Sequence, residues 1–119
     1  MTVRLDSELG AIYVSDQIIT AIAGSAAMSC YGLVGMASRK QFKDGLAELL
    51  GRDNWSRGVV IRRENDELHI DLHIVVSYGT KISEVAHNIQ TKVKYELLAV
   101  AGLKVDQIDI YIQNVMVSR

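Results

Sequence analysis

Residues 67–76 alternate between polar and apolar side chains, and this alternation constrains the fold more than any other feature of the chain. Because successive side chains of a β-strand point to opposite faces of a sheet, the pattern predicts a strand with one face on a core and the other in water. The apolar positions are Leu68, Ile70, Leu72, Ile74 and Val76; the polar positions are Glu67, His69, Asp71 and His73. The predicted solvent-exposed face therefore holds the polar cluster that we consider first as a reactive site.

Two segments have the apolar spacing of amphipathic helices. The first extends from Ile18 to Cys30 and follows Ser15, a residue type that caps helix N-termini. It is rich in alanine, glycine and serine, and we expect these small residues to pack tightly against another element. The second extends from Ile82 to Val100 and ends at Gly102.

Shorter patterns complete the order of elements. Strands are predicted at 10–14, 33–37, 59–63 and 105–117, a hairpin turn at 64–67 and a short helix at 41–50. The order is therefore strand, helix, strand, short helix, strand, strand, helix, strand. It predicts an α+β fold of two layers, in which the two main helices pack on one face of a mixed β-sheet.

The composition bounds the class of protein. The 119 residues are enough for one domain, and we assign residues 1–119 to it. The formal net charge of −1 gives the chain no overall attraction to nucleic acid or anionic lipid. The apolar helical segment 18–30 is shorter than the roughly 20 residues that cross a membrane, and residues 1–6 have no targeting signal, so we expect a cytoplasmic protein. Cys30 is the only cysteine and is expected to be a buried, inert thiol.

The polar cluster His69, Asp71 and His73 has the spacing of metal ligands. Alternate residues of one strand can chelate zinc through an His-x-His pair, and catalytic zinc sites usually have a third protein ligand. A complete site draws ligands from more than one element, and His87 is the only other histidine. A solvated sheet face produces the same pattern without any function. We therefore predict no metal and no other cofactor, and keep a metal-dependent activity at these three residues as an alternative.

Catalytic motifs are not found. The chain has no Gly-x-Ser-x-Gly sequence, and Glu64 and Asp66 fall in the predicted turn, where nothing would desolvate them. We expect no catalytic residue and no enzyme activity. Residues 32–35, Gly-Leu-Val-Gly, match the short loop with which KH domains bind nucleic acid, and Arg39 and Lys40 follow them. A turn explains these glycines better, so a small RNA-binding module is kept only as a further alternative.

Trp55 is the best candidate for a contact with another protein. It is the only tryptophan, it lies in a polar segment, and Arg52 and Arg57 flank it. Trp and Arg are enriched among the residues that dominate the binding energy of protein interfaces. We predict that these three residues bind a protein partner. Tyr95 and Tyr111, on the polar sides of their elements, are weaker candidates of the same kind.

Several stretches of the sequence, in this order and spacing, resemble one known family. They are Gly10–Ser15 leading into Ile18–Ala23 and Ala26–Ala27, then Ile70–Gly79, and finally Glu84–Gln90 with Gly102–Val105. Over residues 8–117 the chain is similar to the alkaline-shock proteins of Gram-positive bacteria, also called envelope stress response proteins. The resemblance implies a small cytosolic α+β protein without known catalysis.

The resemblance also suggests where such a protein acts. Some family members associate with the inner face of the membrane through a separate anchor protein. Short members like this chain resemble those encoded beside a dihydroxyacetone-kinase-like protein linked to fatty-acid phosphorylation. We therefore expect a non-enzymatic interaction or scaffold protein associated with cell-envelope stress or lipid homeostasis. Its partner would be a membrane-anchored protein or the kinase-like protein, and the final strand leaves self-association through a sheet edge open.

Overall fold

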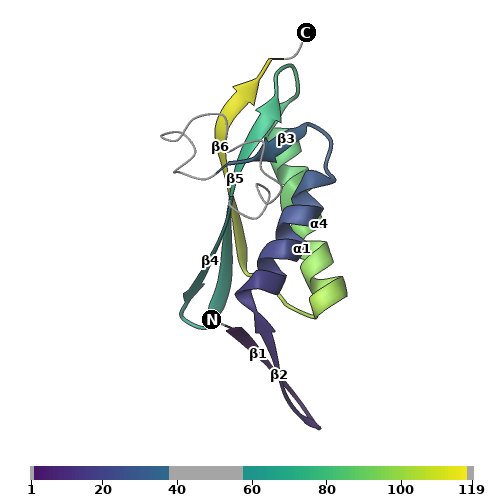
Figure 1. Ribbon diagram of the computed structural model, residues 1–119, viewed down its shortest axis with the longest axis vertical. Coiled ribbons are helices and arrows are strands. Elements are labelled where there is room, and N and C mark those ends of the chain that lie inside the picture. The colour runs from purple at the N-terminus through teal and green to yellow at the C-terminus, as the bar shows by residue number, and fades with distance from the viewer. Residues whose placement is uncertain (1, 38–57, 118–119) are drawn as a thin grey trace.

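The computed structural model describes residues 2–37 and 58–117, and it has the predicted α+β architecture. The elements are β1 (Thr2–Ser7), β2 (Gly10–Ser15), α1 (Asp16–Met28), β3 (Leu33–Met36), β4 (Val59–Glu64), β5 (Glu67–Ser77), α4 (Ile82–Ala101) and β6 (Gln107–Met116). Both helices lie on the same side of the sheet formed by β3, β4, β5 and β6 (Figure 1). The prediction of two layers is therefore confirmed. The predicted short helix at 41–50 lies outside the described residues.

Strand β5 is the centre of this sheet. Along one edge it pairs with β6 in parallel, with Ile70 opposite Ile108. Along the other edge it pairs antiparallel with two strands in turn, because β4 covers its first half and β3 its second half. The sheet is therefore mixed, as the sequence predicts, and β5 has neighbours on both sides over most of its length.

Strands β3 and β4 meet end to end opposite His73. The N–H of Ala37 donates to the carbonyl oxygen of His73, and the N–H of His73 donates to the carbonyl oxygen of Gly58, both over 2.8 Å. Ala37 and Gly58 thus share the two hydrogen bonds that one residue of an uninterrupted antiparallel strand would make. A Cβ atom on Gly58 would lie 2.6 Å from the carbonyl oxygen of His73 and 3.0 Å from that of Ala37, so only glycine fits there without a backbone shift.

The core lies between the sheet and the helices. Its sheet side consists of the predicted apolar face of β5 together with Ile108 of β6. From the helices, α4 buries every fourth residue, and the small residues of α1 are buried as expected: Val85, Ile89, Val93 and Leu97, with Ala23, Ala26 and Ala27. The expectation of tight packing does not hold for the whole of α1, since Ile18 is 48% exposed and Met28 is 41% exposed.

The N-terminal residues form a hairpin that the sequence analysis did not predict. Strand β2 occurs where a strand was expected, but it pairs with β1 rather than with the main sheet. Val3 and Leu5 of β1 pack against the core, whereas Leu9 at the tip is fully exposed. The hairpin points away from the helices and the main sheet (Figure 1).

Local signals explain where the elements begin and end. The Oγ of Ser15 accepts a hydrogen bond from the N–H of Ile18 and so caps α1, as predicted. This helix ends at Met28, two residues before the predicted end at Cys30. Helix α4 ends at Gly102, whose φ of 69° is the left-handed conformation that glycine adopts easily. Asn65 and Asp66 also have positive φ, which gives the predicted hairpin turn between β4 and β5.

Candidate functional site

The polar cluster on β5 is buried, which corrects the prediction of a solvent-exposed face. His69 and Asp71 are each 8% exposed and His73 is 4% exposed. The alternation correctly placed these residues opposite the core. It did not reveal that β5 is a central strand, over which long side chains from β4 and β6 fold across the outer face.

Arg62 of β4 organises the charges of this outer face. Its Nε lies 2.9 Å from Oδ2 of Asp71 and its Nη2 lies 3.1 Å from Oδ1, which is a bidentate pair. Nη2 also reaches Oδ2 of Asp109 at 3.3 Å, and Nη1 bonds to Glu64. The hydrogen bond to Asp71 and the nearby carboxylates raise the pKa of the Arg62 guanidinium above its usual value. Asp71 therefore acts as one half of an internal ion pair.

The two histidines also have partners within the sheet. The ring of His73 stacks on that of Tyr111, with the ring centres 4.9 Å apart, and its Nδ1 lies 2.9 Å from the side-chain amide of Gln113. The Nε2 of His69 lies 3.0 Å from a carboxylate oxygen of Glu67. Its Nδ1 is buried and has no hydrogen-bond partner among the residues that the structure describes. These contacts hold both rings in place.

Among the described residues, the contacts of the cluster are not those of a metal site. Within residues 2–37 and 58–117, no three His, Cys, Asp or Glu side chains lie where they could hold one ion. Asp71 is turned to Arg62, and His73 is held between Tyr111 and Gln113. The alternative of a metal-dependent activity at His69, Asp71 and His73 gains no support from these contacts.

The other candidates from the sequence lie in different places. Trp55, Arg52 and Arg57, the predicted contact residues, lie outside the described residues, and so do Arg39 and Lys40.

Among the described candidates, Tyr95 is 64% exposed on α4, and Tyr111 is 44% exposed despite its contact with His73. Glu64 is exposed and pairs with Arg62. Cys30 is only partly buried, and this burial raises the pKa of its thiol. A raised thiol pKa lowers the thiolate fraction, so it agrees with the expected inert role.

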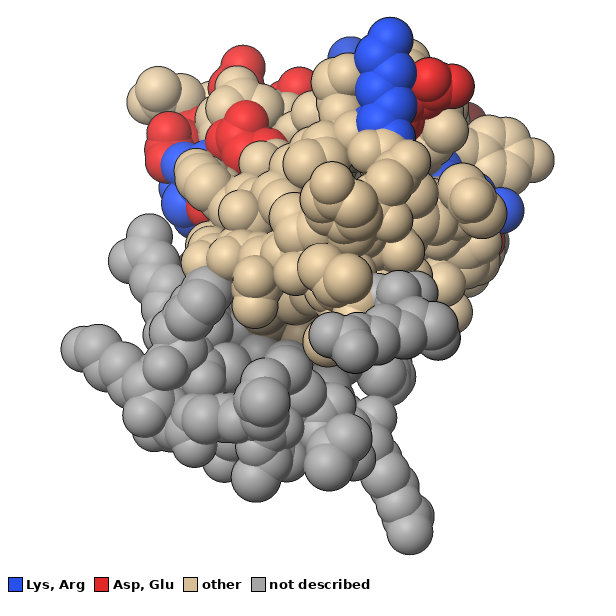
Figure 2. Space-filling model, turned by 90° about the horizontal axis from the view of Figure 1, so that it is seen from above, with Lys and Arg blue, Asp and Glu red and all other residues tan. Residues whose placement is uncertain are grey.

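A surface that the sequence analysis missed lies at one end of the molecule. We call it the apical patch; it consists of Tyr31, Tyr78, Met116 and Val117, which are 86%, 72%, 40% and 66% exposed. Backbone hydrogen bonds join its segments, from the N–H of Tyr78 to Met116 and from the N–H of Ser77 to Gly32, both over 2.9 Å. From this end, the described surface is mostly uncharged, and charged side chains lie along its margin (Figure 2).

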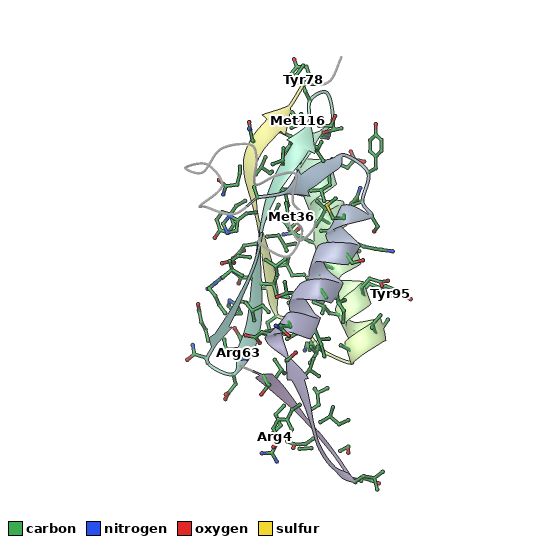
Figure 3. All side chains as sticks on the ribbon, viewed as in Figure 1. Arg4, Met36, Arg63, Tyr78, Tyr95 and Met116 are labelled. Atoms are coloured by element: carbon green, nitrogen blue, oxygen red, sulfur yellow. The ribbon has the colours of Figure 1, made fainter. Side chains whose placement is uncertain are left out.

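The apical patch could not be found by periodicity, because it combines ends of elements and turns. Figure 3 shows Tyr78 and Met116 together at this end and Tyr95 elsewhere on α4. The available signal was that Tyr31 and Tyr78 each precede a glycine at the expected end of an element. Within the described ranges, no helix is long and apolar enough to cross a membrane.

Comparison with known proteins identifies the family. A family model for the alkaline shock protein 23 family, described as having a cell envelope-related function, matches residues 4–117. The chain belongs to this family. The resemblance found in the sequence is thereby confirmed over nearly the whole chain.

Individual proteins are similar to this chain over most of their own length. The uncharacterised protein YloU of Bacillus subtilis is 54% identical over 99% of this chain and 98% of its own length. An uncharacterised protein of Streptococcus pyogenes serotype M6 is 40% identical over 98% of this chain and 97% of its own. A second Bacillus subtilis protein, YqhY, is 32% identical over 92% of this chain and 80% of its own. No solved structure matches the chain.

Proposed function

We propose that this member of the alkaline shock protein 23 family is a non-enzymatic protein that acts by binding another protein in a cell envelope-related process. The family description supports the process. The apical patch supports the mode of action, because large apolar and tyrosine side chains gathered on an uncharged surface are typical of binding sites.

The chemistry of the apical patch indicates the kind of surface that it fits. Tyrosine offers an apolar ring for burial and a hydroxyl group that can donate or accept a hydrogen bond. Met116 adds a flexible apolar side chain that adapts to a partner. A complementary surface is therefore apolar at its centre and carries polar groups that can pair with the hydroxyls of Tyr31 and Tyr78.

The proposed partner and place of action are those that the family resemblance of the sequence led us to expect. In this proposal the protein works in the cytoplasm and reaches the inner face of the membrane only through its partner. The partner is a membrane-anchored protein or a dihydroxyacetone-kinase-like protein linked to fatty-acid phosphorylation. Arg52, Trp55 and Arg57, the contact residues predicted from the sequence, form the other part of the contact surface in this proposal.

The proposal can be tested by capturing partners from native cells with mild crosslinking. We compare the wild-type protein with the double variant Tyr31→Ser/Tyr78→Ser. The control is Tyr95→Ser, because Tyr95 is also well exposed, at 64%, but lies away from the apical patch. We expect one dominant protein to be captured by the wild type and the control and to be lost from the double variant. Thermal unfolding of all three proteins verifies that the fold is unchanged.

Two results would contradict the assignment of the apical patch as the contact surface. Equal capture by the double variant and the wild type would show that the apical patch is not the contact. Loss of the partner from a Trp55→Ala variant alone would place the contact in the 52–57 segment instead. If no other protein is captured in any arm, the proposed function itself fails.

A further inference from the structure

The outer face of the main sheet, on the side away from α1 and α4, carries an excess of negative charge (Figure 1). Its carboxylates form what we call the acidic face: Glu64 of β4, Glu67 and Asp71 of β5, and Asp109 of β6. Among the described residues of these strands, Arg62 is the only Arg or Lys on this side, because Arg63 pairs with Asp16 of α1 on the other. The whole chain has a formal net charge of only −1, so the excess belongs to this face.

The register of the strands sets these carboxylates against one another. Glu64 lies opposite Glu67 in the antiparallel pair of β4 and β5. Asp71 lies opposite Asp109 in the parallel pair of β5 and β6. Like charges directly opposite each other destabilise a sheet. Arg62 bridges Asp71 and Asp109 and also bonds to Glu64, so a single guanidinium serves three carboxylates.

Glu64 and Glu67 have oxygens that are still free to accept hydrogen bonds. Their side chains are 51% and 56% exposed. Among the described residues, Glu64 accepts a bond from Arg62 alone and Glu67 from the ring of His69 alone. A carboxylate has about four lone-pair sites. A cation placed between the two side chains would therefore find acceptors on both and would offset their repulsion.

His69 gives a second, independent indication of a missing donor. It is 8% exposed and lies on β5 between Glu67 and Asp71. Because its Nε2 donates to Glu67, its Nδ1 is an acceptor. This buried acceptor has no partner among the described residues, which is costly in a folded protein. The acidic face therefore lacks N–H donors both at its surface and beneath it.

We propose that the acidic face is the docking surface for a basic segment of a partner protein, with an arginine side chain of the partner between Glu64 and Glu67. A guanidinium has five N–H donors in a rigid plane and no acceptor, so it matches a surface of carboxylates. Arg62 shows this mode of pairing within the chain itself, through its two bonds to Asp71. The acidic face shares no residue with the apical patch, so this inference does not depend on the proposed function.

The first test is a titration of the isotope-labelled full chain with the peptide hexaarginine, followed by NMR. We expect the amide signals of residues 62–71 to shift more than those of α1 and α4, since β4, β5 and their turn carry the free carboxylates. Binding should weaken about tenfold when the salt concentration rises from about 50 to 200 mM, because the site is exposed to screening. If the largest shifts fall on the helices or on the apical patch instead, the proposal is overturned.

Removal of charge locates the site. Glu64→Gln/Glu67→Gln keeps the shape of both side chains and should weaken hexaarginine binding about tenfold. The matched control is Glu8→Gln/Glu84→Gln, which changes the net charge equally at exposed positions in the β1–β2 turn and the first turn of α4. The control should bind within about twofold of the wild type, as expected for distant exposed charges. Equal weakening in both variants would mean that the peptide responds to net charge alone, which contradicts the proposal. The NMR spectra without peptide verify that both variants are folded.

Magnesium chloride and spermine distinguish a protein partner from a free cation. We expect neither to bind as tightly as hexaarginine. A magnesium ion needs ligands that converge on one point, and the described residues offer no such group. Spermine has separate ammonium groups without the planar fork of a guanidinium. If either cation binds as tightly as the peptide and shifts the same signals, the assignment to a partner protein fails.

Discussion

Gly58 occupies a position of the sheet that has no room for a side chain. It sits where β3 and β4 meet, with the backbone of His73 and of Ala37 directly over the position of a side chain. A methyl group there has no flexible neighbour to displace, since the atoms that it would meet belong to the backbone. The sheet would have to shift at its central strand.

We expect Gly58→Ala to lower the free energy of unfolding by about 1–3 kcal/mol, the usual cost of forcing extra atoms into a packed position. Urea unfolding followed by circular dichroism measures it. Gly35→Ala is the matched control, because a Cβ on Gly35 meets nothing within 4 Å; its effect should stay within about 0.5 kcal/mol. Equal losses in both variants would mean that backbone flexibility, rather than the contact with His73, causes the effect.

His69 and Asp71 show which properties of a residue can be predicted from the sequence and which cannot. The alternation in 67–76 correctly assigned His69 and Asp71 to the face opposite the core. Their burial depends on Arg62, which becomes the neighbour of both only through the register of β4 on β5. A register is a property of two segments, so the exposure of a polar side chain cannot be predicted from the pattern of its own strand.

Helices α1 and α4 differ in how their N-termini are capped. Helix α1 has Ser15 as its N-cap, with a side-chain hydrogen bond, whereas the N-cap of α4 is Lys81, whose side chain makes no capping hydrogen bond. A lysine at this position also places a positive charge at the positive end of the helix dipole. Helix α4 therefore forms mainly through its buried face, and Glu84 is the favourable charge of its first turn.

Lys81→Ser should stabilise the protein by about 0.5–1 kcal/mol, because a serine hydroxyl at this position can accept a hydrogen bond from a free N–H of the first turn. The backbone of Lys81 already has the extended conformation of a capping residue. Urea unfolding gives the change in stability. Lys81→Ala removes the charge without supplying an acceptor, so an equal gain from alanine would assign the effect to the charge instead of the cap.

Among the described elements, the helices and the strands from β2 onward were predicted from the sequence, and β1 was missed. Helix α4 repeats its apolar spacing over 20 residues, and its end at Gly102 was predicted correctly. Strand β1 has only Val3 and Leu5 to indicate a strand, and it depends on β2 for its hydrogen bonds. The apical patch arises from ends of elements that the fold brings together, so no local pattern predicts it.

At the scale of the whole molecule, β3 and β4 behave as one strand with an insertion. Both are antiparallel to β5, so they run in the same direction along its edge. The pairing proceeds from Met36 opposite Ile74, through the shared position opposite His73, to Val59 opposite Leu72. Joining Met36 directly to Gly58 would therefore continue the strand in the correct register.

We expect a variant that lacks residues 37–57 to fold, with β3 and β4 fused into a single strand opposite β5. Circular dichroism and urea unfolding should show retained secondary structure and a cooperative transition. Amide hydrogen exchange should show protection of His73, whose N–H would still donate to Gly58. A chain without cooperative unfolding would mean that the deleted residues are required for the fold. If capture of a partner depends on Trp55, this variant should fold but lose that partner.

The meeting of two strands at His73 also bears on how such a chain can evolve. Ala37 and Gly58 are both fixed at one residue of the central strand, so the register of the sheet does not depend on how many residues join them. The general cost of a longer connection is the entropy of closing it. That cost grows by only about 0.6 kcal/mol for each doubling in length. Selection can therefore exchange or extend these residues, including Trp55, without rebuilding the sheet, so recognition can diversify while the scaffold is inherited unchanged.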